Sequence, residues 1–505
     1  MAAWTSSIVE AIDLMRAAGA RHVAVVGMRL GATLATHATR SVGRAADAVV
    51  LWDPCVTGKE FLRHQQILLT TIPGPPEISD GGAGAEVVRG EGVDTPGYRF
   101  SKSLAVDLRR LEIVPVEVPG TRVLVLERPD RAASGRLDHY LGSSSADRID
   151  AIGQEELLDV PPLSSDVPSK SVEDITTWLS GVARPDRAPI TVPEAREAVV
   201  ATDGQDRPIH ERALRLGEIG LFAITTEPEA HGCGPWVMFL NVATEHHIGP
   251  GRLWVDLARQ WARHGVRSVR FDVSGVGDSP LHAGQAESVP YSREWLDDLP
   301  TVARGISPAD PSNTVLIGMC SGGYGAFESG MAIGARGAYA INPVVSSATV
   351  SRSTEQYDRR RRAMRSLPLP LAKLAKKHRR TAWWLWRTYR QFAVWQAPMA
   401  VPATAVRSGL DVLVICGFDD LKPFREVFYW RAFGQRRLER TGRFELAFIP
   451  AMDHPLLFGD GRDAAVRLLS QRVLGRFGPP VDKARLDGDN PGDVRPQSLA
   501  MPARR

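Results

Sequence analysis

The chain contains few cysteines and no long apolar segment. Its four cysteines in 505 residues are scattered, without the paired spacing of a zinc site or the density of a disulfide framework. No run of about 18 uninterrupted apolar residues occurs, and no charged-then-apolar leader, so the sequence predicts neither a membrane span nor a secretory signal. We therefore expect a soluble protein of the reducing cytoplasm, with no metal ion and no cofactor.

A strong charge bias is also missing. The net charge of +4 is small for this length, and 43% apolar with 24% charged residues is ordinary for a globular protein. At about 150 residues per domain the chain is expected to form two or three domains. Nucleic acid is not an expected partner, because no binding fold or base-stacking module accompanies the basic residues.

Two segments share one order of elements. Residues 21–52 and 313–343 each predict a strand, a glycine-bounded turn, a helix and a second strand, the units of a mostly parallel sheet. Later strands at 121–130 and 410–420 each end in acidic residues. This pattern predicts a degenerate tandem duplication in an α/β protein. We expect a truncated first domain at 1–185, a second at 186–478, a linker near 182–195, and an unpacked tail at 479–505.

The turn at Gly318-Met319-Cys320-Ser321-Gly322-Gly323 carries most of the functional information. It has the pattern of a nucleophile elbow, a strained strand-to-helix turn that lifts its central side chain clear of the backbone, with cysteine in place of serine. Cys320 is thus a candidate nucleophile. The alternative is a small core cysteine that packs like an alanine.

A nucleophile of this kind requires a base and an acid that orients the base. Gly417-Phe418-Asp419-Asp420 follows a predicted strand and offers two acids, and His454 follows the next predicted strand. The expected chain order of nucleophile, acid and histidine is therefore present. His454 could instead be a surface residue, and Asp420 a helix N-cap.

The second half resembles an α/β-hydrolase, and more narrowly the serine-aminopeptidase-like hydrolases of bacterial exopolysaccharide and exosortase gene clusters. The resemblance rests on residues 240–280, on the elbow and on the late Asp-His-Pro around His454, and it covers most of residues 205–476. It implies an α/β-hydrolase fold with a helical cap at 346–408. It also favours Asp420 over Asp419 as the acid.

The candidate triad implies an oxyanion hole and a reaction. The backbone N–H of Ser321 and one from the loop after Asn241, from Val242 or Ala243, are expected to bind the oxyanion. Cysteine favours ester or thioester substrates, so we expect a hydrolase or acyltransferase with a covalent acyl-enzyme. His246 and His247 are adjacent, but they lack a third ligand at a suitable spacing and are interpreted as pocket wall or loop surface.

The expected cap is basic and aromatic. Residues 352–390 gather arginines and lysines ahead of several tryptophans. A solvated basic face is the simpler interpretation; recognition of an anionic acyl carrier, or peripheral contact with a membrane, is the sharper one.

The first copy is expected to be inactive. Arg29 stands at its elbow position, a guanidinium is not a nucleophile, and no histidine occurs between His139 and His210. The alternative for the whole chain is a non-catalytic tandem protein that binds a ligand or acts as a scaffold. The sequence predicts no oligomeric state.

Overall fold

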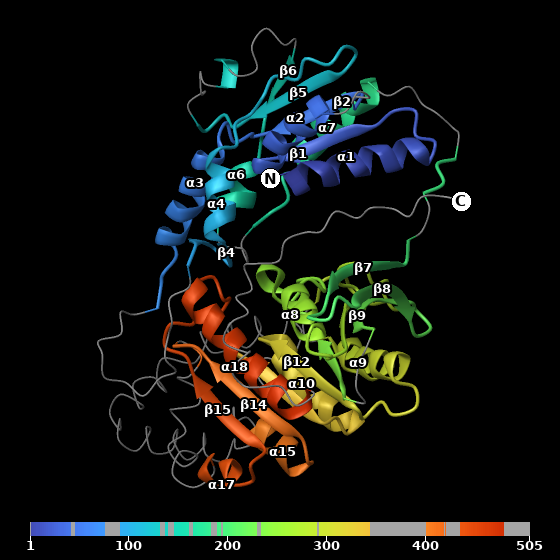
Figure 1. The fold of residues 1–505 in the computed structure, drawn as a ribbon, viewed down its shortest axis with the longest axis vertical. Coiled ribbons are helices and arrows are strands. Elements are labelled where there is room, and N and C mark those ends of the chain that lie inside the picture. The colour runs from blue at the N-terminus through green and yellow to red at the C-terminus, as the bar shows by residue number, and fades with distance from the viewer. Residues whose placement is uncertain are drawn as a thin grey trace, which may run out of the picture. The chain divides into compact units, whose positions relative to one another are not determined.

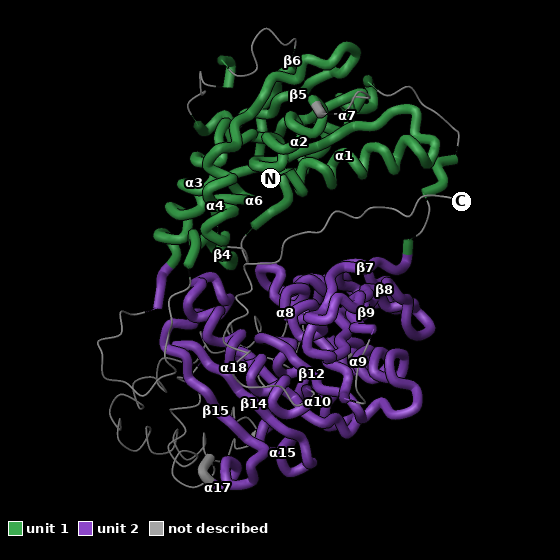
Figure 2. The backbone as a smooth tube through the Cα atoms, viewed as in Figure 1, with its two compact units in different colours: residues 1–72, 91–195, 494–505 green, residues 73–90, 196–493 purple. Residues whose placement is uncertain are grey.

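The computed structural model describes residues 2–41, 46–75, 91–131, 137–139, 146–160, 165–182, 189–192, 195–229, 234–289, 292–343, 400–418, 420 and 435–478. The chain divides into two compact units, shown in Figure 2: unit 1 comprises residues 1–72, 91–195 and 494–505, and unit 2 comprises 73–90 and 196–493. Each unit has its own sheet and its own core.

Unit 1 is built on a parallel sheet with the strand order β1-β2-β5-β6. Its strands are β1 (Ala24–Met28), β2 (Ala48–Trp52), β5 (Arg122–Glu127) and β6 (Ala146–Asp150), and a small hairpin is formed by β3 (Val93–Thr95) and β4 (Tyr98–Phe100). Its helices are α1 (Ala2–Ala17), α2 (Leu30–Ser41), α3 (Gly58–Thr71), α4 (Lys102–Arg109), α6 (Gln154–Leu158) and α7 (Ser169–Val182). Helix α2 packs on one face of the sheet and α7 on the other.

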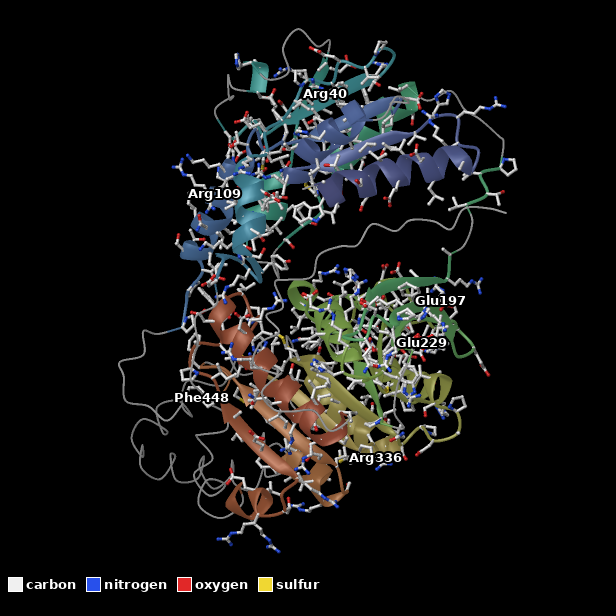
Figure 3. All side chains as sticks on the ribbon, in the orientation of Figure 1. Arg40, Arg109, Glu197, Glu229, Arg336 and Phe448 are labelled. Carbon is white, nitrogen blue, oxygen red and sulfur yellow. The ribbon has the colours of Figure 1, made fainter. Side chains whose placement is uncertain are left out.

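Unit 2 is built on a nine-stranded sheet with the order β15-β14-β13-β12-β10-β11-β9-β8-β7 (Figure 1). The strands are β7 (Glu197–Thr202), β8 (Pro208–Leu216), β9 (Leu221–Pro228), β10 (Trp236–Phe239), β11 (Ser268–Phe271), β12 (Thr314–Met319), β13 (Gly337–Ile341), β14 (Asp411–Cys416) and β15 (Phe444–Phe448). Strands β7, β8 and β9 are antiparallel, and those from β10 onward are parallel. At the outer edge lies exposed Glu197 of β7, labelled in Figure 3. It forms an ion pair with Arg212 of β8.

Helices cover both faces of this sheet. They are the short 3₁₀ turn η2 (Pro250–Arg252), α8 (Leu253–Ala262), α9 (Arg293–Ile306), α10 (Ser321–Ile333), α15 (Ala400–Arg407), α17 (Gln435–Glu439) and α18 (Gly459–Phe477). One core lies between the sheet and α9, α10 and α15. The other lies between the sheet and α8 and α18, where Trp254 and Trp261 both stack on Phe239.

The strand before each elbow shows how the two units differ. Strand β12 is buried along its whole length because β10 and β13 pair with it on either side. Strand β1 pairs with β2, and the sheet order of unit 1 ends at β1. Val26 and Met28 of β1 are accordingly exposed. An apolar sequence therefore forms a central strand in one unit and an edge strand in the other.

The α/β-hydrolase fold expected for the second half is confirmed in unit 2, where β10 and β11 exchange places in an otherwise sequential, mostly parallel sheet. Strands β7, β8 and β9 were not predicted from the sequence. Strand β7 is the partly exposed edge, β8 carries several polar residues, and β9 is a largely buried strand between β8 and β11. Most of the expected cap and all of the expected tail lie outside the described residues. Among the helices of the described residues, none has the length and apolarity to cross a bilayer.

Candidate active site

Cys320 stands at the turn between β12 and α10 with a backbone φ of 53°. Such a value is strained for a residue with a side chain, and glycines make the turn possible. A Cβ on Gly318 would lie 2.1 Å from the backbone carbon of Gly322, so this strand end and the first helical turn touch without side chains. The Cys320 N–H donates to the Ile341 carbonyl at 3.0 Å, which continues the β12–β13 ladder into the elbow. The predicted elbow geometry is therefore present.

The other described cysteines behave differently. Cys55 and Cys416 are buried, whereas Cys320 is partly exposed. Burial raises the pKa of the Cys55 thiol to about 12 and also raises that of Cys416, so both remain protonated at neutral pH. The core-cysteine interpretation suits these two residues.

His454 and Asp420 meet at the carboxyl edge of the sheet. The His454 Nδ1 lies 2.8 Å from the Asp420 Oδ1, within hydrogen-bond distance. The Asp420 hydrogen bond and a second one with the Cys320 side chain raise the pKa of His454 to about 10, and partial burial opposes them. The structure therefore brings together the three side chains that the sequence singled out, because both Asp420 and Cys320 act on His454.

Asp419, the other acid considered, lies outside the described residues. Asp453, next to the histidine, has a different function: its carboxylate accepts hydrogen bonds from the backbone N–H groups of Leu457 and Phe458. These bonds shape the turn that leads into α18. Burial raises the pKa of Asp453, with the two N–H donors acting against it.

The candidate oxyanion donors lie beside the elbow. Ser321 begins α10, and its Oγ accepts a hydrogen bond from the Ala243 N–H at 2.8 Å. Ala243 has a φ of 48°, and the adjacent Val242 forms an isolated bridge with Glu245. Ala243 therefore contacts the elbow directly, and its N–H is already engaged by a hydroxyl.

The loop that carries Ala243 is held by two buried polar residues. Asn241 donates to the Asp272 Oδ1 and to the Glu245 carbonyl, both at 2.9 Å, and it accepts from the Val273 N–H. Asp272 also accepts from the backbone and, at 2.8 Å, from the ring of His247. Burial disfavours the charged form of Asp272, but the His247 bond and the other donors outweigh it and lower its pKa. The sequence analysis missed Asn241 in this role.

His247, Asp272 and Asp278 form the one cluster with metal-like donor spacing in the described part of the chain, with ligand atoms within 4.8 Å of one another. Each carboxylate oxygen of Asp272 already accepts at least two hydrogen bonds. This bonding suits a carboxylate that fixes a loop. His247 is buried and His246 is exposed, so the loop-surface interpretation suits His246 alone.

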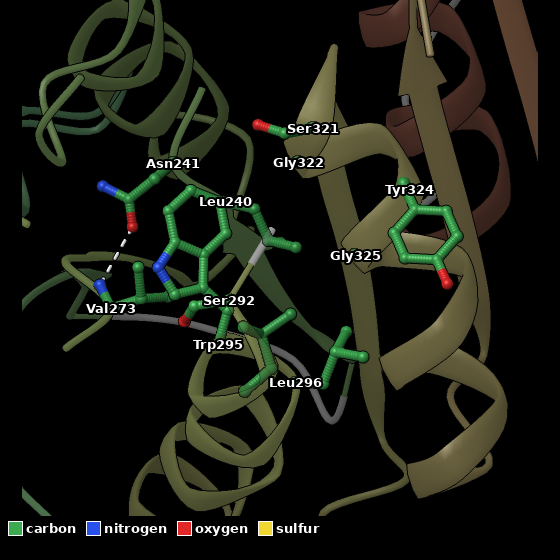
Figure 4. A pocket seen from close by; sticks show the side chains of 11 residues that line it. Leu240, Asn241, Val273, Ser292, Trp295, Leu296, Ser321, Gly322, Tyr324 and Gly325 are labelled. Atoms are coloured by element: carbon green, nitrogen blue, oxygen red, sulfur yellow. Dashed lines mark hydrogen bonds between the residues drawn. The ribbon is translucent and has the colours of Figure 1, made fainter. Parts of the chain in front are cut away.

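A small cavity of about 30 Å³ opens beside the first turn of α10 (Figure 4). Its walls combine Ser321 and Gly322 of the elbow helix with Leu240, Asn241 and apolar side chains of α9. Trp295 and Ser292 line it as well, and within the described residues the Trp295 Nε1 and Ser292 Oγ are buried without hydrogen-bond partners. The cavity is thus mostly apolar and has polar atoms in its wall.

Unit 1 contains a similar turn with different chemistry. Arg29 follows β1 with a φ of 52°, and its N–H donates to the Trp52 carbonyl as Cys320 does to Ile341. Its guanidinium forms an ion pair with Asp53 at 2.8 Å and contacts the His64 Nδ1 at 2.9 Å. Burial, and then the charge of Arg29, lower the pKa of His64. A cation therefore occupies the place where unit 2 holds a thiol.

Solved structures similar to the chain include α/β-hydrolases. XC6422 from Xanthomonas campestris, described as an α/β serine hydrolase without lid, is 17% identical, and the match covers 56% of this chain and 100% of that one with a TM-score of 0.33. The Pyrococcus furiosus esterase Pf2001 is 14% identical (56% and 98% coverage, TM-score 0.31), and α/β hydrolase domain-containing protein 10 from mouse is 15% identical (52% and 98%, TM-score 0.31). No protein-family model matches the chain, and no curated protein matches its sequence. At these identities the likeness concerns the fold.

Proposed function

We propose that unit 2 is an acyl hydrolase or acyltransferase that acts on an ester or thioester through Cys320, His454 and Asp420. The observation that carries this proposal is the imidazole of His454, held at 2.8 Å by the Asp420 carboxylate, with a pKa that the side chains of Asp420 and Cys320 both raise. A histidine with a raised pKa beside a cysteine favours an imidazolium–thiolate pair, the reactive form of such a nucleophile.

The first half-reaction forms an acyl-enzyme. The Cys320 thiolate attacks the acyl carbonyl carbon, a carbon–sulfur bond forms, and the carbonyl electrons move onto the oxygen. The tetrahedral intermediate then expels the alkoxide or thiolate leaving group, which receives its proton from the imidazolium of His454. Neutral His454 and the thioester of Cys320 remain.

The oxyanion needs donors during this step. The Ser321 N–H at the head of α10 is one, because a helix N-terminus favours negative charge. The second is the Ala243 N–H, which donates to the Ser321 Oγ at 2.8 Å. In this mechanism the Ala243 N–H donates to the oxyanion, either in place of the Ser321 Oγ or in addition to it. The backbone N–H of Val242 is the alternative second donor.

The second half-reaction releases the acyl group. His454 takes a proton from water, or from an alcohol or amine acceptor, and the resulting nucleophile attacks the thioester carbonyl. The carbon–sulfur bond breaks, and the Cys320 thiolate returns beside protonated His454. Water gives hydrolysis and another acceptor gives transfer, so the acceptor decides the product.

Several further expectations belong to this proposal. The basic segment 352–390 would recognise an anionic acyl carrier or contact a membrane surface, and replacement of the four arginines at 359–362 should then raise KM for an anionic substrate. An unchanged KM would leave a solvated basic face. We place the protein in the cytoplasm, where thiols are kept reduced.

Unit 1 is proposed to be a degenerate copy of the second half of the unit 2 sheet. Its support is the repeated turn: positive φ at Arg29 and Cys320, and again at Asp53 and Asn342 after the next strand. The Arg29–Asp53 ion pair leaves no nucleophile there. An active esterase fragment of residues 1–185 would refute this assignment.

A thiol-directed acyl probe tests the enzyme proposal. We expect the full chain to become labelled at Cys320 by an activated thioester, Cys320→Ala to lose the label, and Cys416→Ala to keep it as the matched control. Absence of labelling by any ester or thioester probe would favour the second candidate, a non-catalytic protein that binds a ligand or acts as a scaffold. The ion-paired elbow of unit 1 is the observation that keeps this candidate open.

A further inference from the structure

Asn342 is a buried residue directly after β13, and the sequence analysis gave it no function. It is 0% exposed and has a φ of 43°. Asparagine is among the few residues other than glycine that adopt this left-handed conformation readily. Its backbone N–H donates to the Ile415 carbonyl at 2.8 Å, so the residue still belongs to the sheet edge.

The Asn342 side chain joins the ends of three strands. Its Oδ1 accepts from the Gly417 N–H, after β14, at 2.7 Å. Its Nδ2 donates to the carbonyls of Asp453 and His454, after β15, at 3.1 and 3.0 Å. Both amide hydrogens and the amide oxygen are therefore used by loops that carry the acid and the base.

The same two loops also touch directly. A Cβ on Gly417 would lie 2.1 Å from the Met452 carbonyl oxygen, and the Phe418 N–H donates to that oxygen at 3.2 Å. Asp420 lies three residues after Gly417. The loop that leads to Asp420 is thus held against the loop that leads to His454, and the Asn342 side chain bonds to both loops.

We propose that Asn342 is a positioning residue for the reaction: it sets the separation of the Asp420 and His454 loops and so orients the imidazole toward Cys320. This inference rests on the proposed function. A residue that served stability alone could make the same bonds, so the test must separate the two roles.

Unit 1 shows what the same position does without the reaction. Asp53 follows β2 with a φ of 42°, and its N–H donates to Leu126 as that of Asn342 does to Ile415. Its carboxylate cannot donate to carbonyls, and it instead accepts from Arg29 and from the Gln154 amide at 2.7 Å. The link that Asn342 makes to the His454 loop, called the clamp below, thus depends on its two amide hydrogens. In unit 1 the corresponding residue, Asp53, has no such hydrogens.

Two variants isolate the clamp. Asn342→Gly keeps the positive φ and removes all three side-chain bonds. Asn342→Asp is nearly the same size and keeps an acceptor for Gly417, but it sets oxygen against the carbonyls of Asp453 and His454. Tyr339→Phe is the control on the same strand, because it removes the buried 2.6 Å bond to Asp411 at a distance from the site.

With an activated thioester as substrate, we expect both Asn342 variants to lower kcat by about 10-fold to 100-fold at nearly unchanged KM, as a misplacement of about 1 Å does. The kcat–pH profile should shift as well, because the Asp420–His454 contact is altered. Tyr339→Phe should lower Tm without changing kcat. If Asn342→Gly fails to fold, Asn342→Asp decides alone.

An unchanged kcat and pH profile in folded Asn342→Asp would overturn the inference and leave Asn342 a purely structural residue. A fall in rate that merely follows the folded fraction would do the same. Cys320→Ala separates this result from a failure of the proposed function. If that variant is as active as the wild type, the reaction itself is wrong; if it is inactive while the Asn342 variants are normal, only the positioning role is lost.

Discussion

Replacement of Asp420 by asparagine should move the alkaline limit of activity toward neutral pH. The Asp420 carboxylate accepts from His454 at 2.8 Å and stabilises the protonated imidazole, whose pKa it helps to raise to about 10. Asparagine preserves the size of the side chain and removes the charge. The imidazolium then loses its partner, so the pKa of His454 falls.

The size of this shift follows from the exposure of the pair. Opposite charges about 4 Å apart attract by about 1 kcal/mol in water and about 4 kcal/mol at an effective dielectric constant of 20. The side chain of His454 is 35% exposed and that of Asp420 is 17% exposed, so solvent screens the pair in part. We take about 2 kcal/mol, which corresponds to a pKa lower by about 1.5 units.

The assay is kcat/KM for an alkyl ester such as ethyl acetate, whose alkoxide leaving group requires a proton, between pH 6 and 11, with Cys320→Ala as the blank for background hydrolysis. Protonated His454 is the acid for the leaving group, so the wild-type rate should fall as pH rises through about 10. In Asp420→Asn the fall should begin about 1.5 units earlier. Asp256→Asn, an equal change of charge on α8, should leave the limit in place. Superimposable wild-type and Asp420→Asn profiles would refute the assignment of Asp420.

Three further predictions concern other parts of the chain. Gly318→Ala should destabilise unit 2 by about 3 kcal/mol or more in chemical denaturation, because its Cβ would overlap backbone at 2.1 Å, whereas Gly31→Ala, with open space around it, should be neutral. If the cavity of about 30 Å³ holds the acyl group, activity should decline beyond short acyl chains. Trp295→Phe removes a buried indole N–H, so it should slow the turnover of hydroxyacyl substrates more than that of alkyl substrates. An equal effect on both substrates would exclude a contact between the indole N–H and the substrate. Arg29→Ala should cost unit 1 about 2 kcal/mol, because the largely buried Asp53 loses its cationic partner and keeps only the Gln154 hydrogen bond. Acyl turnover should be unchanged, and a loss of turnover would contradict an inactive unit 1.

Local patterns predicted much of unit 2. The apolar runs of β12 and β14 and the glycines around Cys320 are short-range signals, and each led to an element found in the structure. The sequence also predicted that Cys320, Asp420 and His454 lie near one another. Each follows a predicted strand, and the carboxyl ends of neighbouring parallel strands meet at one edge of a sheet.

The parts that could not be predicted depend on distant contacts. Asn342 looks like any turn residue in sequence, and its function appears only when the ends of β14 and β15 lie beside it. The Ala243–Ser321 bond likewise joins residues 78 positions apart. Strand β8 carries polar side chains along a partly exposed strand, and periodicity alone did not separate it from loop.

The glycines of the two elbows indicate how a neighbouring strand constrains a turn. A Cβ on Gly27 of unit 1 would meet the Gly31 carbonyl oxygen at 2.5 Å, as Gly318 would meet Gly322, so both strands end against their own helix. Gly322 would also meet the Asn241 carbonyl oxygen at 2.5 Å, whereas Gly31 would meet nothing within 4 Å. Asn241 follows β10, whereas in the described part of unit 1 only β2 pairs with β1, and no strand lies on the other side of β1. The glycine before the elbow residue, Gly318 or Gly27, is therefore required by the elbow itself. Gly322 is required because β10 brings the loop after Asn241 against the start of α10. The described residues of unit 1 retain the elbow but include no strand that would supply the second oxyanion donor, so we do not expect a nucleophile in place of Arg29 alone to restore catalysis there.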